Sequence, residues 1–525
     1  MDNFINSITD INDAVNTFVW TTIGVWLLIA VGVIMSGFTG FFQVTHIGHW
    51  LKKTIGSLFD RKVTGKTKEK ASISQFQALC TALAATVGVG NIAGVAAAIM
   101  SGGPGAVFWM WVAAFFGMMT NFSENVLGIY FRRKNKSGEW SGGAMYYLQD
   151  GLGGYKGMKG AGRVLAVIFA VCAVLASFGI GNMGQVNKIV KNFTSAFNIQ
   201  ALSDIVLYKA ADESASVTLY MLIVGIVLMV LVGVIVIGGI QRIAQVAEKI
   251  VPCMVVLFVF GSLIIIFVNI THIGSAFAAI FGSAFTSKAA WGAASGLTLK
   301  TVITMGCKRG VFSNEAGLGS SVMVHSNSNV VEPVKQGLWG IFEVFADTMI
   351  VCTMTALTIL TSGVIDLTTG AAVTSDDSTL VAEAFNTVFK IGNIEIGRAF
   401  IACAILLFAF TTVLGWSHYG SKAVEYLAGD KAETAVKIYK AIFTLMVISG
   451  AVLTSSLAWD ISDTFNGMMM IPNLIGVVAL APLVRKITLN YIDRRIKGKD
   501  TEPVLSFFPD IEKENARKIA ETGED

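Results

Sequence analysis

Apolar segments of about twenty residues or more recur along this chain, and they constrain its fold more than any other feature. A hydrocarbon core about 30 Å thick requires about 20 apolar residues for each crossing helix. The composition agrees, because 54% of the 525 residues are hydrophobic, only 14% are charged, and the mean hydropathy is +0.66. The alternating pattern of a membrane β-barrel is absent. The sequence therefore predicts an all-α integral membrane protein with about eleven spans, at residues 17–42, 74–100, 105–131, 161–197, 217–240, 243–270, 295–324, 335–362, 397–426, 435–456 and 459–485.

The second of these spans contains residues that do not suit an uninterrupted helix in lipid. Within residues 80–98 it places Thr86, Gly88, Gly90 and Asn91 close together. We therefore expect this helix to break at membrane depth. The alternative is that the small residues only allow two helices to pack closely.

A break at this place leaves polar backbone groups on both halves of the helix. Carbonyls near residues 84–87 would lose their partners and attract a cation, while amides near residues 89–91 would begin the second half and attract an anion. A cation-coupled amino-acid transporter needs these two half-sites side by side.

A second span, at residues 295–324, is also interrupted. It carries two charges and two glycines within residues 305–310, followed by a polar stretch at residues 313–317. Each interrupted span opens a run of five spans, and paired interruptions at corresponding positions indicate an inverted repeat with a site near the middle of the membrane. The expected organisation is an extra N-terminal helix with a cytoplasmic amphipathic loop (1–73), a first repeat (74–270), an outer surface segment (271–294), a second repeat (295–485) and a cytoplasmic tail (486–525).

The distribution of charge predicts the orientation in the membrane. Lysines and arginines collect between residues 46 and 70 and again at residues 132–136, so both loops are expected in the cytoplasm, with the N-terminus outside and the C-terminus inside. The cysteines lie in or beside predicted spans, with neither disulfide nor metal spacing. We expect a multi-pass protein of the cytoplasmic membrane, with no organic cofactor.

Several spans carry polar residues in patterns that indicate a binding site. Phe178, Asn182 and Gln185 are spaced to share one helical face, and Thr411, Thr412, Trp416 and His418 form a polar stripe. Such residues need a partner, a cavity or a ligand, and a hydrogen bond to a neighbouring helix is the alternative. Five charged residues in predicted spans form either buried pairs at an inner gate or the lining of a water-filled vestibule. These residues are Glu124, Arg309, Glu315, Glu343 and Asp347.

Three motifs together resemble the alanine or glycine:cation symporter family across essentially the whole membrane region. They are Ala-Ala-Thr-Val-Gly-Val-Gly-Asn-Ile-Ala-Gly-Val at residues 84–95, Gly-Gly-Pro-Gly-Ala-Val-Phe-Trp-Met-Trp at residues 102–111, and Arg-Gly-Val-Phe-Ser-Asn-Glu-Ala-Gly-Leu-Gly-Ser at residues 309–320. That family is similar in fold to the bacterial leucine transporter, with a core of five plus five inverted helices, here preceded by one extra helix.

The resemblance also implies ligands. The carbonyls of Ala84, Val87 and Phe408, with the hydroxyls of Thr411 and Thr412, would surround one sodium ion, the coupling ion. The amides near Val89 and Gly90 would hold the substrate carboxylate, while Thr86 and Asn91 match a second sodium site of the related fold, and Thr412 is an alternative substrate ligand. Sodium accepts such neutral oxygen ligands.

A zwitterionic substrate also needs an acceptor for its ammonium group and walls that limit its size. Acceptor candidates are Gln185, Asn182, Asn91 or a carbonyl near Met305 or Gly306, and wall candidates are Phe178, Met305 and Trp416. The expected substrate-binding residues are thus Thr86, Gly88, Val89, Gly90, Asn91, Phe178, Asn182, Gln185, Met305, Gly306, Thr412 and Trp416.

The expected function is sodium-coupled symport of a small neutral amino acid, alanine or glycine, into a prokaryotic cell by alternating access. A proton-coupled carrier on the same fold is the alternative, and a channel or a membrane-embedded enzyme fits less well, because no hydrolase, metalloprotease or phosphate-loop motif is present. The partners are the amino acid, sodium and the lipid bilayer, without nucleic acid. A monomer is compatible with the sequence, which does not indicate the oligomeric state.

Overall fold

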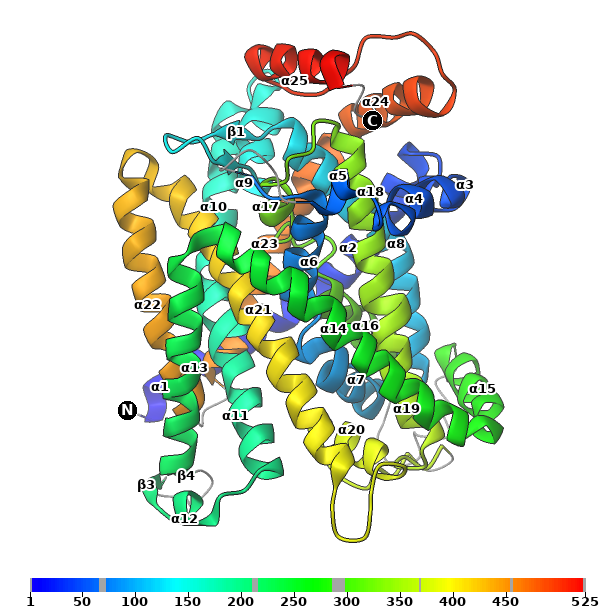
Figure 1. Ribbon diagram of the computed structural model, residues 1–525, viewed down its shortest axis with the longest axis vertical. Helices are drawn as coiled ribbons and strands as arrows, with labels where there is room; N and C mark the ends of the chain where they lie inside the picture. Colours follow the sequence, from blue (N-terminus) through cyan, green and yellow to red (C-terminus); the bar gives the residue numbers. More distant parts are fainter. Residues whose placement is uncertain are drawn as a thin grey trace.

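The structure, a computed structural model, describes residues 2–65, 72–209, 216–285, 298–367, 370–453 and 457–522. It is a bundle of long helices with two short hairpins (Figure 1). One end of the bundle carries α3, α4, α24 and α25, and the opposite end carries α12, α20 and the hairpin β3–β4. Here α marks α-helices, and η marks π-helical or 3-10 turns.

Seven helices within the described residues are long and apolar enough to cross a membrane, or up to nine if each bent pair counts as one span. The seven are Ser7–Phe38, Gly105–Tyr130, Lys159–Ala196, Leu219–Ile237, Gly239–Val268, Pro333–Thr361 and Ile396–Val452. The predicted count of eleven is not confirmed. The difference arises because α16 has only 16 residues, and because the two helices of Ile396–Val452 are counted as one stretch.

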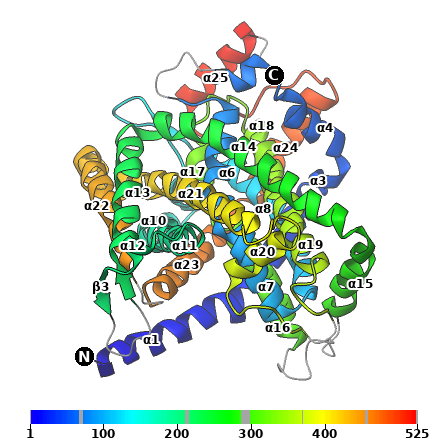
Figure 2. The same cartoon turned by 60° about the horizontal axis from the view of Figure 1, so that its bottom comes forward.

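The N-terminal region forms one long helix followed by short helical turns. Its elements are α1 (Asp2–Asn16), η1 (Thr17–Gly24), α2 (Val25–Phe38), α3 (Phe42–Thr45), α4 (Ile47–Lys53), η2 (Ile55–Ser57) and α5 (Arg61–Thr64). α1 lies along α23, as Figure 2 shows.

The first predicted repeat opens with the broken helix and continues through four longer ones. Its elements, and those that follow up to residue 285, are α6 (Gln75–Thr86), η3 (Gly90–Gly94), α7 (Val95–Gly102), α8 (Gly105–Tyr130), β1 (Arg133–Lys134), β2 (Trp140–Ser141), α9 (Ala144–Tyr146), η4 (Tyr147–Gly151), η5 (Leu152–Gly154), α10 (Lys159–Phe178), η6 (Gly179–Met183), α11 (Gly184–Ala196), α12 (Gln200–Ser203), β3 (Val206–Lys209), β4 (Ser216–Thr218), α13 (Leu219–Ile237), α14 (Gly239–Val268), η7 (Ile270–His272) and α15 (Ile273–Ala284). Both hairpins, β1–β2 and β3–β4, are antiparallel.

The second predicted repeat has a comparable order of elements and is followed by a helical tail. The elements are α16 (Leu299–Asn314), α17 (Val322–His325), α18 (Pro333–Val344), η8 (Phe345–Cys352), α19 (Thr353–Thr361), α20 (Asp377–Asn386), α21 (Ile396–Ala428), η9 (Gly429–Lys431), α22 (Ala432–Val452), α23 (Leu457–Ala479), α24 (Ala481–Tyr491), η10 (Ile492–Ile496) and α25 (Pro509–Thr522). α23 and α24 meet at a bend of 58°.

The position of the second break differs from the expected one. α16 runs without interruption through residues 305–310 and ends at Asn314, where Glu315 adopts a left-handed conformation with φ 55°. The charges do not break the helix. Lys308 pairs with Asp463 at 2.9 Å and donates to Asn16 at 3.4 Å, and the guanidinium of Arg309 lies 5.9 Å from the ring centroid of Phe312. The chain then turns through residues 315–321 into α17.

Helices of the two predicted repeats pack against one another. α8 lies against α16 and α18, α6 against α21, α10 against α21 and α23, and α13 against α22. The centre of the bundle, where the end of α6 meets α21, is fully buried.

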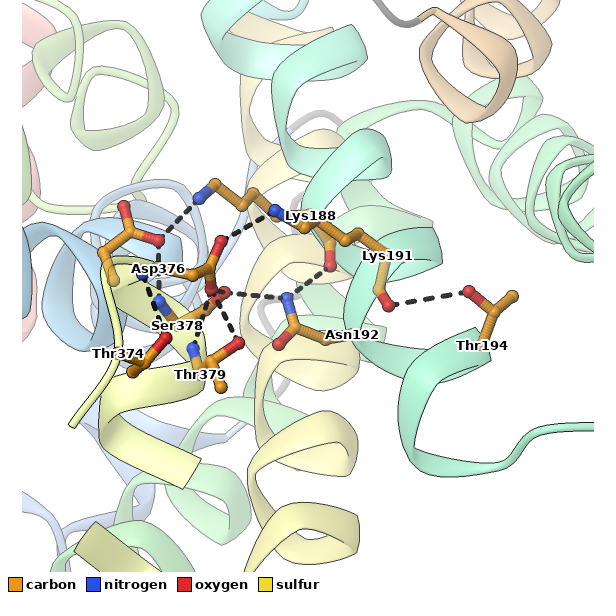
Figure 3. A network of polar contacts seen from close by, with 9 residues as sticks. Lys188, Lys191, Asn192, Thr194, Thr374, Asp376, Ser378 and Thr379 are labelled. Atoms are coloured by element: carbon orange, nitrogen blue, oxygen red, sulfur yellow. Dashed lines mark hydrogen bonds and ion pairs between the residues drawn. The ribbon is translucent and has the colours of Figure 1, made fainter. Parts of the chain in front are cut away.

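A polar network joins α11 to the N-terminus of α20 (Figure 3). Lys191 Nζ pairs with Asp376 Oδ2 and Lys188 Nζ with Asp377 Oδ1, each at 2.7 Å. Asp376 Oδ1 caps α20 by accepting from the amide and hydroxyl of Thr379, both at 2.8 Å. The network therefore links two elements at the end of the bundle opposite α25.

Candidate functional site

The broken first helix is the centre of the site. α6 begins with a reciprocal cap, in which the amide of Gln77 donates to Ser74 Oγ and the amide of Ser74 donates to Gln77 Oε1. It ends at Thr86, and the axis turns by 55° before the helix resumes over Gly90–Gly102. The predicted break within residues 84–91 is confirmed. At such a break the first half leaves carbonyls, and the second half leaves amides, without intrahelical partners.

Asn91 holds the broken turn in place. Gly88 N–H donates to Asn91 Oδ1 at 2.9 Å, and Asn91 N–H donates to Gly88 O at 3.2 Å. Asn91 Nδ2 donates to Asp347 Oδ1 at 2.7 Å, while Thr355 Oγ1 donates to Asn91 O at 2.7 Å. We expected Asn91 among the substrate ligands, but the structure places its side chain against Asp347 of η8.

A cavity of about 20 Å³ lies beside the break. Residues from α6, the break, η6, α11, α16, α21 and α23 bound it. They are Ala85, Thr86, Gly88, Gly90, Ile180, Gln185, Phe312, Glu315, Thr412, Trp416 and Asn466. A volume of this order accommodates about one water molecule, so even a small amino acid enters only if the elements around the cavity move apart. Thr86, Gly88, Gly90, Gln185, Thr412 and Trp416 are predicted site residues that the structure brings together.

The closeness of the break to α21 depends on Gly88. A Cβ atom added at Gly88 would lie 2.5 Å from Thr412 Oγ1 and 3.5 Å from Gln185 Oε1. A similar approach occurs at Gly181, where an added Cβ would lie 2.5 Å from Trp416 Cγ. Main chain therefore forms part of the cavity wall at Gly88, whereas at Gly181 it packs directly against the indole of Trp416.

Two amide side chains of the lining have acceptors without partners among the described residues. Gln185 Nε2 donates to Ile180 O at 3.1 Å, but Gln185 Oε1 is buried and has no hydrogen-bond donor among the described residues. Asn466 Oδ1 is likewise buried without a donor among them. An unpaired buried acceptor is costly and calls for a donor. An ammonium group supplies three donors, so these atoms suit the amino end of an amino acid.

The carboxylate of Glu315 adds a negative group to the same cavity. Glu315 Oε1 accepts from Trp416 Nε1 at 3.0 Å, and Oε2 accepts from Ser320 Oγ. The residue follows the last turn of α16 in a left-handed conformation. This conformation is uncommon for a non-glycine residue and is often found at functional sites. Glu315 thereby fixes the indole that forms one wall.

The side chains of Phe178 and Asn182 point away from this cavity. The ring of Phe178 lies 5.3 Å from that of Tyr439, and Asn182 Nδ2 donates to Phe443 O at 2.7 Å, so both contact α22. The expectation that they share one face with Gln185 is wrong. The expectation fails because η6 lies between these residues. A π-helical turn adds a residue to the helix and rotates the side chains after the turn relative to those before it.

The predicted cation ligands on α21 surround one carbonyl. Thr411 Oγ1 and Thr412 Oγ1 donate to Phe408 O at 2.9 Å and 3.0 Å. Thr411 Oγ1 also donates to Leu407 O at 3.0 Å and lies 3.7 Å from Met254 Sδ, whereas Thr412 faces the break. The hydroxyl lone pairs stay available for a cation.

The other half of the predicted cation site lies at the end of α6. Ala84 and Val87 are buried there, and Gly415 of α21 approaches so closely that an added Cβ would lie 2.6 Å from Ala85 Cβ. The structure thus brings the two halves of the predicted ligand set to neighbouring elements. Their coordination of an ion stays a prediction.

Met305 and Gly306 lie outside the cavity lining. Both are inside the unbroken α16, where Met305 packs at Gly102 and Gly306 packs against Ala106 and Trp109. The carbonyls of a helix interior are bonded within the helix, so the predicted free carbonyl at Met305 or Gly306 is wrong. Val89 is buried beside the lining residues Gly88 and Gly90.

The carboxylates in the predicted spans are buried and bonded mainly to neutral groups. Glu124 accepts from Asn473, Glu343 from Asn121 at 3.1 Å, and Asp347 from Ser313 at 2.7 Å. Glu343 Oε2 also lies 2.9 Å from His325 Nε2. Since these carboxylates are at most 4% exposed, they do not line a solvated vestibule, and among the described residues none pairs with Arg309.

The sequence reasoning did not single out several lining residues, namely Ala85, Ile180, Phe312 and Asn466. Asn466 carried a signal, because polar residues cluster at residues 460–466 within a predicted span. The sequence alone assigns Glu315 no single role, and its place in the cavity results from the end of α16.

Comparisons with known proteins agree on one family. The sodium:alanine symporter family matches residues 5–505 of the chain. The sodium/alanine symporter AgcS of Methanococcus maripaludis is 39% identical over 478 residues, which cover 90% of this chain and 94% of that protein. An uncharacterized transporter of Haemophilus influenzae is 38% identical over 502 residues, which cover 95% of this chain and all of that protein.

Among solved structures, MhsT in complex with L-phenylalanine is similar with a TM-score of 0.49 and 14% identity, and the match covers 79% of this chain and 98% of that one. The family match extends over nearly the whole chain, and its members are transporters, not enzymes. The apolar helices that it spans are those of a multi-pass membrane protein. The chain belongs to the sodium:alanine symporter family.

Proposed function

We propose that this protein couples the inward movement of sodium to the uptake of a small neutral amino acid, alanine or glycine, by alternating access. The observation that carries the proposal is the broken helix beside a small cavity with unpaired acceptors at Gln185 and Asn466. A helix start, two amide oxygens and a carboxylate in one place match the two ends of a zwitterion.

In this proposal the substrate carboxylate binds at the start of the second half-helix, near the amides of Val89 and Gly90. The ammonium group donates to Gln185 Oε1 and Asn466 Oδ1, with Glu315 supplying negative charge. Phe312 and Trp416 limit the side chain, because both line a cavity that accepts little added volume.

The coupling ion binds beside the substrate in a cage of neutral oxygens. Its ligands are the carbonyls of Ala84, Val87 and Phe408 and the hydroxyls of Thr411 and Thr412. Two observations support them: both hydroxyls lie on Phe408 O, and the described residues contain no cluster of acidic, histidine or cysteine ligands for a metal. A cage of neutral oxygens suits a hard monovalent cation that must be released again on the other side of the membrane.

The proposed architecture is one extra helix followed by two inverted repeats of five spans. The order of elements supports it, since α6–α7, α8, α10–α11, α13 and α14 correspond in order to α16–α17, α18–α19, α21, α22 and α23. In each set the first helix is interrupted. The proposed orientation has the N-terminus outside and the C-terminus in the cytoplasm of a prokaryotic cell.

Uptake of labelled alanine into proteoliposomes tests this function. The expected result is saturable uptake that requires external NaCl, stops when choline chloride replaces it at constant pH, and supports counterflow in preloaded vesicles. Uptake of equal rate in choline chloride would contradict sodium coupling. A flux that neither saturates nor exchanges would indicate a channel.

A proton-coupled carrier is a second candidate, favoured by one observation. Glu315 places a carboxylate in the cavity lining, where a change of its protonation would act directly on the substrate site. An imposed pH gradient across sodium-free vesicles distinguishes the two. Alanine accumulation under that gradient supports proton coupling, and its absence supports sodium alone.

A further inference from the structure

A second cavity, far larger than the first, lies at the beginning of α10. Its volume is about 440 Å³, and it is lined by Gln149, Asp150, Gly153, Gly154, Lys159, Arg163 and Phe507. It combines the loop before α10, the first turns of α10 and the segment before α25. The substrate site uses none of these residues.

The charge inside this cavity is positive. Lys159 and Arg163 are exposed, and among the described residues neither forms an ion pair, whereas the carboxylate of Asp150 is paired with Arg133. α10 also begins here without a side-chain cap, because its N-cap residue is Met158. A 20-residue helix presents free amides and a partial positive charge at that end. Two cations and a helix start in one cavity suit a phosphate group.

An apolar surface continues from the cavity along α10. Val164, Val167, Ile168, Val171 and Leu175 are exposed at helical spacing, on a helix that is long and apolar enough to span a membrane. Lys159, Arg163 and Val167 recur every four residues, so the cations lie at the head of this surface. In a bilayer such a surface contacts acyl chains, and the basic residues then lie at the level of the headgroups.

We propose that this cavity binds the headgroup of an anionic phospholipid, with its acyl chains along the exposed face of α10. A free phosphate would use the same cations, but it would not use the apolar surface below them or the half-exposed ring of Phe507 at the rim. The predicted orientation places this end of α10 in the cytoplasm, at the leaflet where basic pockets bind anionic headgroups.

Lipid binding is measured directly on the purified full-length protein by native mass spectrometry, with phosphatidylglycerol and phosphatidylcholine as probes. Phosphatidylglycerol is expected to bind, and the double variant Lys159→Gln/Arg163→Gln is expected to weaken it about tenfold or more. Phosphatidylcholine should bind weakly to both proteins. Lys156→Gln is the matched control, because Lys156 is exposed in the same loop but does not line the cavity.

Two results would overturn the proposal. One is equal binding of phosphatidylglycerol by the double variant and the unmodified protein. The other is displacement of the lipid by millimolar inorganic phosphate, which would assign the cavity to a soluble phosphate. Because the readout is lipid binding, it is independent of alanine transport, and thermal unfolding of each variant shows whether it has folded.

Discussion

At the scale of single residues, the site depends on contacts between main chain and side chain across the break. The space between Gly88 and Thr412 is filled, so that even one added carbon would overlap the hydroxyl oxygen. Gly94, six residues further along the chain at the end of η3, has open space around it. Substituting alanine at each of the two glycines therefore distinguishes the effect of a steric clash, at Gly88, from the effect of helix propensity alone, at Gly94.

Gly88→Ala is expected to abolish alanine uptake, because its Cβ would push Thr412 and the break apart. Gly94→Ala is the control, and it should retain uptake and gain slightly in stability, since alanine favours helix by about 1 kcal/mol over glycine. Initial uptake rates in proteoliposomes, normalised to the amount of reconstituted protein, measure both. Retained transport in Gly88→Ala would contradict the described geometry.

Glu315→Gln tests the role of the carboxylate without changing its shape. A glutamine can still accept from Trp416 Nε1, but it cannot supply negative charge to an ammonium group. We expect the KM for alanine to rise about tenfold, since a hydrogen bond to a charged group contributes about 1.5–3 kcal/mol, while folding is preserved. Substrate saturation curves and thermal unfolding measure the two effects.

An unchanged KM in Glu315→Gln would limit Glu315 to positioning Trp416. In that case Trp416→Phe, which removes the donor, should still alter selectivity toward larger side chains. Competition of labelled alanine uptake by amino acids of increasing size provides that readout.

At the scale of elements, the network between α11 and α20 shows how charge ties two segments together (Figure 3). Burial would raise the pKa of Asp376, but hydrogen bonds from Lys191, Thr379 and Ser378 outweigh it and hold the pKa below its ordinary value. A carboxyl whose pKa is lowered by folding stabilises the protein above its unfolded pKa, near 3.8, and loses that contribution as the pH falls toward its folded pKa.

Asp376→Ala is expected to lower stability by about 1 kcal/mol, the typical value of a helix N-cap. Thermal unfolding of the purified protein measures this as a lower Tm of the variant. The Tm difference from the unmodified protein should stay constant between pH 8 and about pH 5 and become smaller only in more acidic solution. Asp430→Ala is the control, because the Lys136–Asp430 pair is almost fully exposed. A Tm difference that is largest at low pH would contradict the assignment.

Elements were predictable from sequence where apolar length or a glycine cluster dominated. The break of α6 is predictable because Gly88, Gly90 and Asn91 stand together in the chain. The interruption expected at residues 305–310 was wrong, because Lys308 finds Asp463 and Asn16, partners remote in sequence. η6 contains a similar cluster, Gly179, Gly181 and Asn182, but there the helix continues through a π-helical turn instead of breaking. The orientation of Gln185 relative to Asn182 could therefore not be read from helical spacing.

At the scale of the whole molecule, the cavity forms where both predicted repeats meet, with Thr86 and Gln185 from one and Glu315 and Thr412 from the other. Which residues of each repeat face one another depends on long-range packing. The sequence identified most of the contributing helices through their polar residues. Asn466 also stands in a polar cluster, at residues 460–466, but its place in the lining depends on the packing of α23. Under the proposed function, a site shared in this way would couple its two ligands, since each would stabilise an arrangement that the other needs.

That coupling predicts a reciprocal effect on stability. Alanine is expected to raise the Tm of the purified protein in NaCl and to leave it nearly unchanged in choline chloride, because a ligand at a hundred times its Kd contributes about 2.7 kcal/mol only where it binds. Thr411→Ala should require more sodium for the same shift. Thermal unfolding across a sodium series measures both. An alanine-induced shift of equal size without sodium would contradict the coupling.

The main chain at Gly88 and Gly90 forms part of the wall of the cavity beside the break. A wall of this kind has nothing that mutation can shorten, and any side chain introduced there only takes room away. Space for a larger solute would therefore have to come from shortening side chains elsewhere in the lining, such as Trp416 and Phe312.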